Sequence, residues 1–184
     1  MTIDQTIEVL KNGGTILYPT DTIWGIGCDA TNEEACQKIL KLKDRPDDKS
    51  FILLVDGFQM LERFVPDFNP ICYDLVDLSE KPLTIIYPSV KGIAQCVPAA
   101  DGTVGIRITK DPICLKLIRS LRKPIVSTSA NVSGKSTPTI YSEIVPVIKE
   151  GVDAVLEERT HEKMTTPSQI IKIDLDGSVK IIRK

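Results

Sequence analysis

The hydrophobic residues of this chain recur in two patterns, a helical spacing and short continuous runs. Ile3, Ile7 and Leu10 are spaced as on one face of a helix, and Thr2 with Gln5 forms a capping box ahead of them. Such a box satisfies backbone N–H groups at a helix start, so a helix is predicted to begin close to the first residue.

Further helices are indicated by start signals in front of later apolar stripes. A second capping box and two prolines at first helical positions are typical of helix starts. These signals are Thr31 with Glu34, Asn69-Pro70, and Asp111-Pro112, the last for a helix through about Leu121; a further helix is expected at 145–149 and ends at Gly151.

Short apolar runs between these helices predict strands, several of them covered on both faces. They lie at 15–18, 51–55, 83–87, 104–108, 125–127, 169–173 and 179–182. The last two are joined by Asp176-Gly177, which is a hairpin turn signal. Strands that alternate with helices and end in a hairpin predict an α/β fold with a mixed sheet. No repeat or linker divides the chain, so one domain over 1–184 is expected.

Composition and charge narrow the classes of function. Hydrophobic residues make up 42% and charged residues 26%, as in an ordinary globular protein. Lys and Arg number 23 against 25 Asp and Glu, so no global positive field attracts nucleic acid or an anionic membrane. Any polyanion must therefore be held by a local patch. No apolar run reaches the ~18 residues of a membrane span and no signal peptide precedes the first helix, which favours a cytoplasmic protein.

The cysteines and the single histidine do not form a catalytic or zinc-binding pattern. The five cysteines contain no C-x-x-C pair and are expected to be reduced, packed as small apolar residues. His161 lies in a polar run and is expected to be solvated in a loop. Zinc binding and Cys-His or Ser-His-Asp catalysis are therefore disfavoured.

Candidate chemistry lies in four polar clusters near strand ends. The first is 19–27, where Thr20 and Thr22 offer hydroxyls and Gly25 and Gly27 allow a ligand to approach the backbone. The alternative for this cluster is a tight connection that anchors Trp24 in the core.

The second cluster is cationic and contains Lys41, Lys43, Arg45 and Lys49. Guanidinium and ammonium groups at this density suit the phosphates of a polyphosphate. The alternative is a solvated helix end, where cations are favoured by the helix dipole.

The third cluster is a single charge in an apolar strand, Arg107 in 104–108. An isolated charge is costly to bury, so Arg107 must either bind a ligand or form a structural salt bridge.

The fourth cluster, 127–139, follows a strand and is rich in hydroxyl groups. Gly134-Lys135-Ser136 matches the end of a P-loop, but Ser129 replaces its first glycine and Pro138 would interrupt the helix that must follow. We therefore interpret the segment as a loop that binds a small polar ligand or phosphates. None of the four clusters holds an obvious nucleophile or general base, which favours catalysis by positioning and charge neutralisation, as in nucleotidyl transfer.

Taken together, these clusters resemble the YrdC family of threonylcarbamoyl-AMP synthases, in its short single-domain form. The resemblance covers nearly the whole chain and keeps the family's order of motifs. The stretches that carry it are YPTDT at 18–22 with GIG at 25–27, KDRP at 43–46, VGIR at 104–107, STSANVSG at 127–134 and TPS at 166–168.

The resemblance implies a twisted sheet around a large, concave, positively lined cavity. It also implies a reaction in which L-threonine, bicarbonate and ATP give threonylcarbamoyl-AMP and pyrophosphate. Partner transferase proteins then place the threonylcarbamoyl group on adenosine 37 of tRNA. Mg²⁺ is expected to arrive with ATP, because the sequence offers no convincing carboxylate cage. Weak binding of tRNA or double-stranded RNA, and none of membranes, is a further expectation.

The resemblance also implies roles for individual residues. Arg45 and Lys49, with Lys43 beside them, are expected to contact the ATP phosphates and to be catalytic. The threonine site is expected to consist of Thr22, Arg107, Ser129 and Ser168, with Arg107 as a fork onto the carboxylate. The nucleotide site is expected to consist of Arg45, Lys49, Thr103, Thr128, Asn131, Thr139 and Arg183.

Three alternatives to this synthase activity remain open. Leu54 stands where longer relatives carry a threonine-contacting His, and Gln169 stands where Thr is common. A YciO-like paralogue with the same fold and a different reaction is therefore one alternative. A non-catalytic module that binds double-stranded RNA or nucleotide is the second. An ATP-dependent carbamoyl-type transferase for another amino acid is the third.

Overall fold

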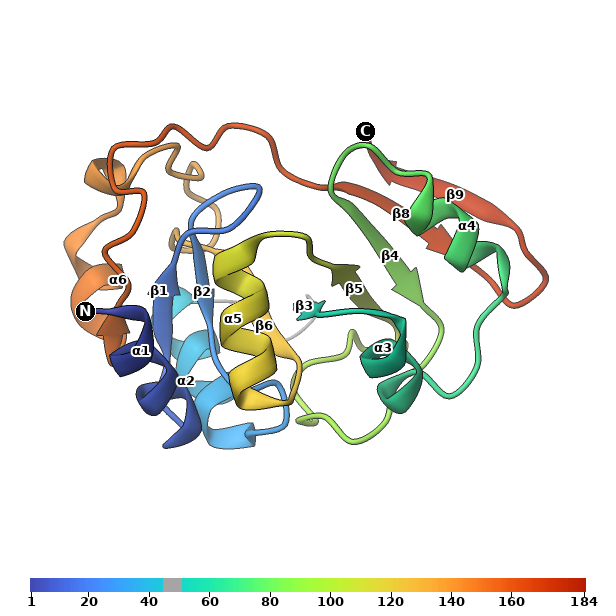
Figure 1. Cartoon of the computed structure of the whole chain (residues 1–184), viewed down its shortest axis with the longest axis horizontal. Helices are drawn as coiled ribbons and strands as arrows, with labels where there is room; N and C mark the ends of the chain where they lie inside the picture. Colours follow the sequence, from blue (N-terminus) through green and yellow to red (C-terminus); the bar gives the residue numbers. More distant parts are fainter. Residues whose placement is uncertain (45–50) are drawn as a thin grey trace.

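The computed structural model describes residues 1–44 and 51–184, and their strands form one mixed sheet (Figure 1). The strands are β1 (Ile16–Tyr18), β2 (Gly25–Gly27), β3 (Ile52–Val55), β4 (Leu83–Tyr87), β5 (Val104–Ile108), β6 (Ile125–Ser129), β7 (Ala154–Val155), β8 (Gln169–Ile173) and β9 (Val179–Arg183). Their order across the nine-stranded sheet is β7-β1-β2-β6-β3-β5-β4-β8-β9. The pairs β1–β7, β3–β5 and β4–β8 are parallel and the other neighbours are antiparallel, which confirms the predicted mixed α/β fold.

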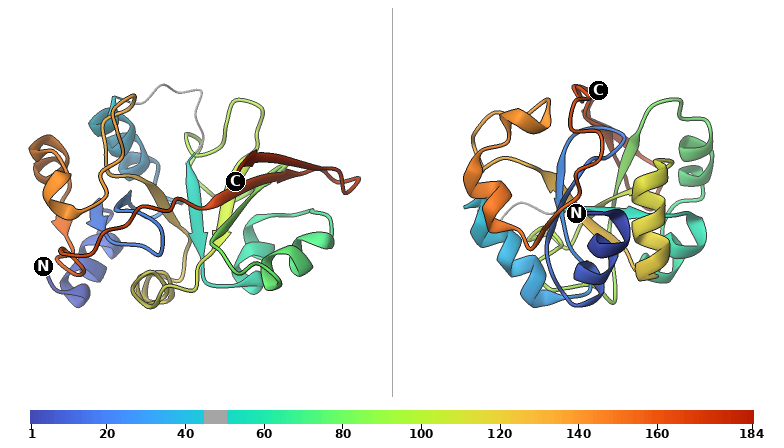
Figure 2. Two further views of the ribbon diagram at one scale, coloured as in Figure 1. Left: turned by 90° about the horizontal axis from the view of Figure 1, so that it is seen from above. Right: turned by 60° about the vertical axis from the view of Figure 1, so that its left-hand side comes forward.

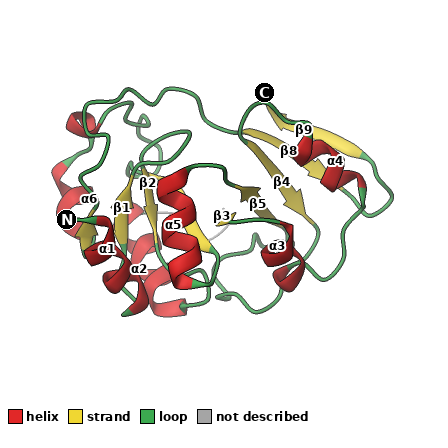
Figure 3. Cartoon of the chain, in the orientation of Figure 1, coloured by secondary structure: helices red, strands yellow, loops and turns green. Residues whose placement is uncertain are grey.

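The helices are distributed around this sheet (Figures 1 and 3). They are α1 (Ile3–Lys11), α2 (Glu33–Lys43), α3 (Phe58–Phe64), α4 (Ile71–Asp77), α5 (Pro112–Leu121), the short 3₁₀ helix η1 (Tyr141–Glu143) and α6 (Pro146–Gly151). In Figures 1 and 2, α1, α3 and α5 lie on the same side of the sheet, and α2 packs with α6 beyond its other side. None of the helices in residues 1–44 and 51–184 combines the length and apolar composition that crossing a bilayer requires.

The helix starts largely follow the sequence signals. The capping box of Thr2 and Gln5 is present, and the Asp111 carboxylate accepts from the N–H groups of Ile113 and Cys114 at 2.9 and 3.0 Å. The box predicted at Thr31 and Glu34 is wrong by one residue. The Thr31 hydroxyl donates to Asp29 at 2.7 Å, so the Asn32 side chain caps the helix instead.

Two elements were not predicted because their sequence signals are short. Residues 25–27 form strand β2, whose glycines pack against β6 rather than adopt a positive φ. A Cβ on Gly27 would lie 2.8 Å from the Tyr18 ring, so the close approach requires glycine. Helix α3 has seven residues, too few for its apolar spacing to stand out.

The core lies between the sheet and its helices. Its largest fully buried side chains include Trp24, Tyr18, Tyr87 and Phe51. All five cysteines are free and four are buried, which confirms that they pack as apolar residues without disulfides. His161 is exposed in a loop, as expected.

Candidate functional site

A row of small and apolar side chains on one face of the sheet forms the floor of a cavity. Ile52 pairs with Gly105 on β5 and Ser127 on β6, and Gly105 pairs with Ile86 on β4. Directly paired residues point to the same face of a sheet, so these four share one surface. They line a cavity of about 700 Å³, in which Gly105 supplies no side chain.

The cavity collects predicted site residues from distant parts of the chain. Those in its lining are Thr22, Arg107, Thr128, Ser129, Ser168 and Arg183. They come from the turn between β1 and β2, from β5, from β6, from the segment before β8 and from β9. Two arginines, Arg107 and Arg183, therefore lie in the described part of the cavity wall.

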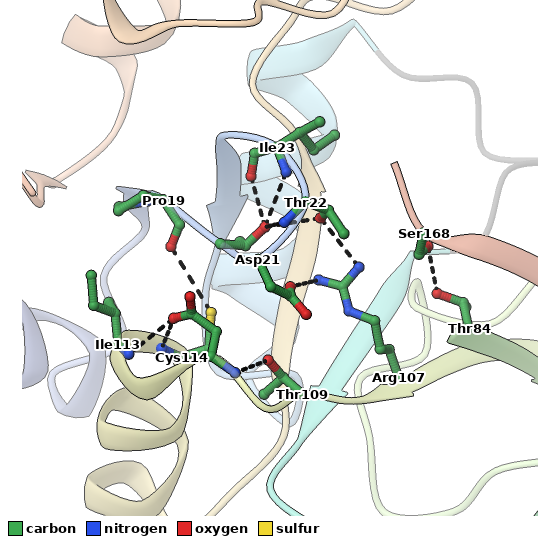
Figure 4. A network of polar contacts seen from close by, with 12 residues as sticks. Pro19, Asp21, Thr22, Ile23, Thr84, Arg107, Thr109, Ile113, Cys114 and Ser168 are labelled. Atoms are coloured by element: carbon green, nitrogen blue, oxygen red, sulfur yellow. Dashed lines mark hydrogen bonds and ion pairs between the residues drawn. The ribbon is translucent and has the colours of Figure 1, made fainter. Parts of the chain in front are cut away.

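Arg107 is buried in the cavity wall and only partly neutralised (Figure 4). Its Nη2 donates to Asp21 at 2.9 Å and its Nη1 donates to the Thr22 hydroxyl at 3.3 Å. Its Nε–H is also buried, yet it has no partner among the described residues. The structural salt bridge is therefore present, and the binding of a ligand by Arg107 stays a prediction.

Burial also affects the carboxyl partner of Arg107. It raises the pKa of Asp21, and the adjacent Arg107 charge opposes this shift without cancelling it. The Asp21 side chain is 21% exposed, against 4% for Arg107. The ion pair therefore sits at the edge of the cavity, with the guanidinium as its inner member.

The turn at 20–23 is ordered by one hydroxyl group. Thr20 Oγ1 donates to the Ile23 carbonyl at 2.8 Å and accepts from the backbone N–H groups of Thr22 and Ile23. A hydroxyl has a single proton, so in the 2.9 Å contact between Thr20 and Thr22 the Thr22 hydroxyl is the donor. Thr22 Oγ1 is thereby left to accept from Arg107, and the turn fixes the position of the guanidinium.

A second cationic group, Arg183, also lines the cavity. Arg183 donates from Nε to the Ser168 carbonyl at 2.9 Å and from Nη2 to the Ser168 hydroxyl at 3.3 Å. The Ser168 hydroxyl also contacts Thr84 Oγ1 at 2.8 Å. Desolvation and the nearby Arg107 charge both lower the pKa of Arg183, as expected for two guanidinium groups facing one cavity.

Lys43 connects the end of α2 to the hydroxyl-rich loop. Its side chain is buried, and its ammonium group donates to the backbone carbonyls of Ser129 and Asn131. The Lys43 carbonyl in turn accepts from the Ser133 N–H at 2.8 Å. Lys43 therefore orders the loop that carries Ser129, and its predicted contact with phosphates stays a prediction.

The other predicted residues fall in different places. Thr139 lines a smaller cavity of about 190 Å³ that shares Ser129 and Arg183 with the large one. Asn131 Nδ2 donates to Val132 and Lys135 carbonyls, while its buried Oδ1 has no partner among the described residues.

Thr103 is not among the residues that line the cavity, and its hydroxyl donates to Asp101 at 2.7 Å. The predicted residues Arg45 and Lys49 lie outside the described residues.

Some features of the site were missed from the sequence, and others were interpreted correctly. Thr84 and Ile170 line the cavity but sit in apolar strands, where only the single polar position at Thr84 was a signal. The rejection of a P-loop is confirmed, since Gly134 has a φ of 78° and the next helical element is the 3₁₀ turn at Tyr141–Glu143.

A known protein family matches nearly the whole chain. The model named for Sua5, YciO and YrdC, and described as "Telomere recombination", matches residues 8–184. Curated relatives named threonylcarbamoyl-AMP synthase are similar over most of the chain. The protein from Pseudoalteromonas translucida is 33% identical over 97% of this chain and 96% of its own, and that from Hydrogenovibrio crunogenus is 34% identical over 76% and 77%.

Solved structures share the fold. P. abyssi Sua5 in complex with L-threonine matches 93% of this chain with a TM-score of 0.80 and 26% identity. The chain spans only about half the length of that protein, 50%. E. coli YciO matches 99% of this chain and 88% of its own, with a TM-score of 0.83 and 24% identity, a level at which the likeness concerns the fold alone.

Proposed function

The chain belongs to the Sua5, YciO and YrdC family, and from this premise we propose that it is a threonylcarbamoyl-AMP synthase. It converts L-threonine, bicarbonate and ATP into threonylcarbamoyl-AMP and pyrophosphate. As an enzyme it is a transferase, and the group transferred is the adenylyl moiety of ATP.

One observation carries the proposal for this chain: the unpartnered Nε–H of buried Arg107 in the cavity wall. Buried donors in native proteins nearly always find an acceptor, so this N–H is available to a molecule bound in the cavity. A substrate carboxylate suits it, because a guanidinium binds carboxylate oxygens through charge-assisted hydrogen bonds. Thr22, Ser129 and Ser168 lie in the same lining and offer hydroxyls to a small zwitterion such as threonine.

The proposed chemistry proceeds in two steps with these residues around it. The threonine amine condenses with bicarbonate to a carbamate, with loss of water. A carbamate oxygen then attacks the α-phosphorus of ATP, a P–O bond forms, and the bond to pyrophosphate breaks. Negative charge collects on the transferred and leaving phosphates, so the cations Arg183, Arg45 and Lys49 are the proposed stabilisers.

Magnesium is proposed to enter with the nucleotide. The described residues that line the large cavity offer hydroxyls, backbone and guanidinium groups but no carboxylate. Among the described residues, no group of three His, Cys, Asp or Glu side chains is arranged to hold a metal ion. This donor set does not form a Mg²⁺ site of its own, and we derive no step through the ion.

The product implies further participants. An acyl-adenylate is a reactive intermediate, so we propose that partner transferase proteins receive it for threonylcarbamoyl modification of tRNA. Free cysteines throughout the chain are consistent with a reducing compartment and support the proposed cytoplasmic location.

A YciO-like paralogue remains the second candidate. It would keep the fold and the cavity but act on another substrate. Curated synthases at 33% identity over nearly full length favour the synthase.

The deciding assay is pyrophosphate release from ATP. The synthase requires that release depend on both threonine and bicarbonate, and that serine replace threonine poorly. Arg107→Gln is expected to raise the KM for threonine far more than that for ATP. Pyrophosphate release that is indifferent to threonine would contradict the proposal and favour the paralogue. No pyrophosphate release under any condition would also contradict it and favour a non-catalytic RNA-binding module.

A further inference from the structure

A cationic cleft outside the cavity is lined by side chains from α3 and the end of α5. We call it the arginine cleft, and its lining consists of Asp56, Gln59, Met60, Arg63, Arg119 and Arg122. It has a volume of about 290 Å³ and shares no lining residue with the large cavity. Helices α3 and α5 lie on the same side of the sheet in Figures 1 and 2.

The arginine cleft carries excess positive charge. Among the described residues, its lining contains one acidic side chain, Asp56, and three arginines. The Asp56 carboxylate lies 3.7 Å from Arg119 Nε, which is a loose ion pair. Neither Arg63 nor Arg122 has a carboxylate within ion-pair distance in the described part of the chain. Guanidinium groups gathered in this way match the oxygens of a phosphate.

The helix dipoles account for only part of this charge. Arg63 and Arg119 lie in the last turns of α3 and α5, where cations are ordinarily favoured. Arg122 lies beyond the end of α5, in the left-handed region with a φ of 59°. Glycine or asparagine is the usual residue there, because a Cβ atom approaches the backbone carbonyl too closely and asparagine offsets this strain with local hydrogen bonds. An arginine at this position therefore adds a third cation at a conformational cost, which indicates a role beyond ending the helix.

We propose that the arginine cleft is a binding site for a phosphate group. The phosphate is either a free anion or one phosphodiester of an RNA backbone, since both present the same oxygens. Arg119 and Arg122 hold it by forked hydrogen bonds, and Arg63 contributes from the facing helix. This inference is independent of the function proposed for the cavity.

The test is residue-resolved, because the cavity also contains guanidinium groups. The full chain, labelled with ¹⁵N, is titrated with inorganic phosphate at constant ionic strength, and in a second arm with a short RNA duplex. The expected result is a shift of the Nε–H signals of Arg63, Arg119 and Arg122. Shifts with inorganic phosphate identify a free anion as sufficient, and shifts with the duplex alone identify a phosphodiester; both outcomes support the site.

The variant Arg122→Gly sharpens this test. Glycine fits the left-handed position, so the variant is expected to unfold at the same or a higher temperature than the parent protein. Its affinity for the phosphate probe at the arginine cleft is expected to fall about tenfold. Arg122→Asn, which also tolerates this conformation, is the second variant if glycine perturbs the helix end. Lys180→Ala removes one exposed positive charge from β9 and is the matched control. Absence of shifts at the three arginines in both arms, or an equal loss of affinity in Lys180→Ala, would overturn the proposal.

Discussion

Replacing Arg107 by methionine separates its structural role from its role in binding. The substitution keeps an unbranched side chain but leaves Asp21 without its cation in a largely buried place. Removing one partner of a fully buried pair costs about 3–5 kcal/mol. Asp21 is 21% exposed and its pKa is already raised, so hydration and protonation reduce the cost of leaving this carboxylate without a cation. We therefore expect Arg107→Met to lower the free energy of unfolding by about 1–3 kcal/mol.

The pH dependence of this loss has a defined sign. Without Arg107, the folded-state pKa of Asp21 rises further above its unfolded value. The native state then binds more protons than the unfolded state above the unfolded pKa, so stability falls as pH rises through that window. The deficit of Arg107→Met relative to the parent protein is therefore smallest in acid and largest near neutrality.

A second substitution distinguishes the two roles of Arg107. Adding Asp21→Asn removes the stranded carboxylate, so the double variant should regain a large part of the lost stability. Threonine binding should not recover, because the charge-assisted contacts to its carboxylate are still missing. Such contacts contribute about 1.5–3 kcal/mol, which corresponds to a roughly 10–150-fold weaker affinity.

Urea unfolding and threonine titration measure these effects. The matched control is Arg119→Met, which breaks an Arg–Asp contact of 3.7 Å in which the arginine is 63% exposed. Because solvent screens such an exposed pair, it contributes about 0–1 kcal/mol to the free energy of unfolding, so Arg119→Met should destabilise the protein only slightly. Equal destabilisation by the two substitutions, or threonine affinity restored in the double variant, would refute this account of Arg107.

Three further predictions concern stability. Lys43→Met removes the ammonium that binds two loop carbonyls and should cost about 1–3 kcal/mol in urea unfolding, together with faster amide exchange over 129–135. Gly27→Ala should lower the free energy of unfolding by about 1–3 kcal/mol, because its Cβ would overlap the Val126 carbonyl. Gly57→Ala is the control, since its Cβ would meet nothing within 4 Å, and it should cost less than about 1 kcal/mol. Similar losses in the two variants would contradict the close packing at Gly27. Burial alone would raise the pKa of Asp153, but hydrogen bonds from Lys38 and Thr15 outweigh it and lower the pKa. Solvent screens this carboxylate, which is 38% exposed, so Asp153→Asn should lower the free energy of unfolding at neutral pH by less than about 1 kcal/mol. The difference should vanish as pH falls through the lowered pKa.

Local signals in the sequence were sufficient for most elements but not for their neighbours in space. The Asp111-Pro112 start gave helix α5 with its observed bounds, because capping depends on adjacent residues alone. The Thr31 box failed because a nearby carboxylate competes for the same hydroxyl. Strand β2 was missed because three residues with two glycines carry no periodicity.

For the candidate site, too, the residues were predictable but their contacts with distant parts of the chain were not. The resemblance identified Thr22, Arg107, Ser129, Ser168 and Arg183, which the structure gathers in one lining. The partners that hold them could not be predicted, since the contact of Arg107 with Asp21 and that of Ser168 with Thr84 depend on how strands pair. Lys43 also illustrates this limit. Its charge indicated phosphate, while its position on two backbone carbonyls depends on where α2 ends.

The glycine in the floor of the cavity also determines how large a molecule the cavity can hold. At Gly105 the available room is set by a missing side chain, since an added Cβ would lie 3.3 Å from Thr84 and 3.5 Å from Ile52. One methyl group at that position would shrink the compartment without moving a strand. The volume of the cavity, and with it the size of the molecule that fits, therefore depends on one residue of the sheet and not on the pairing of its strands.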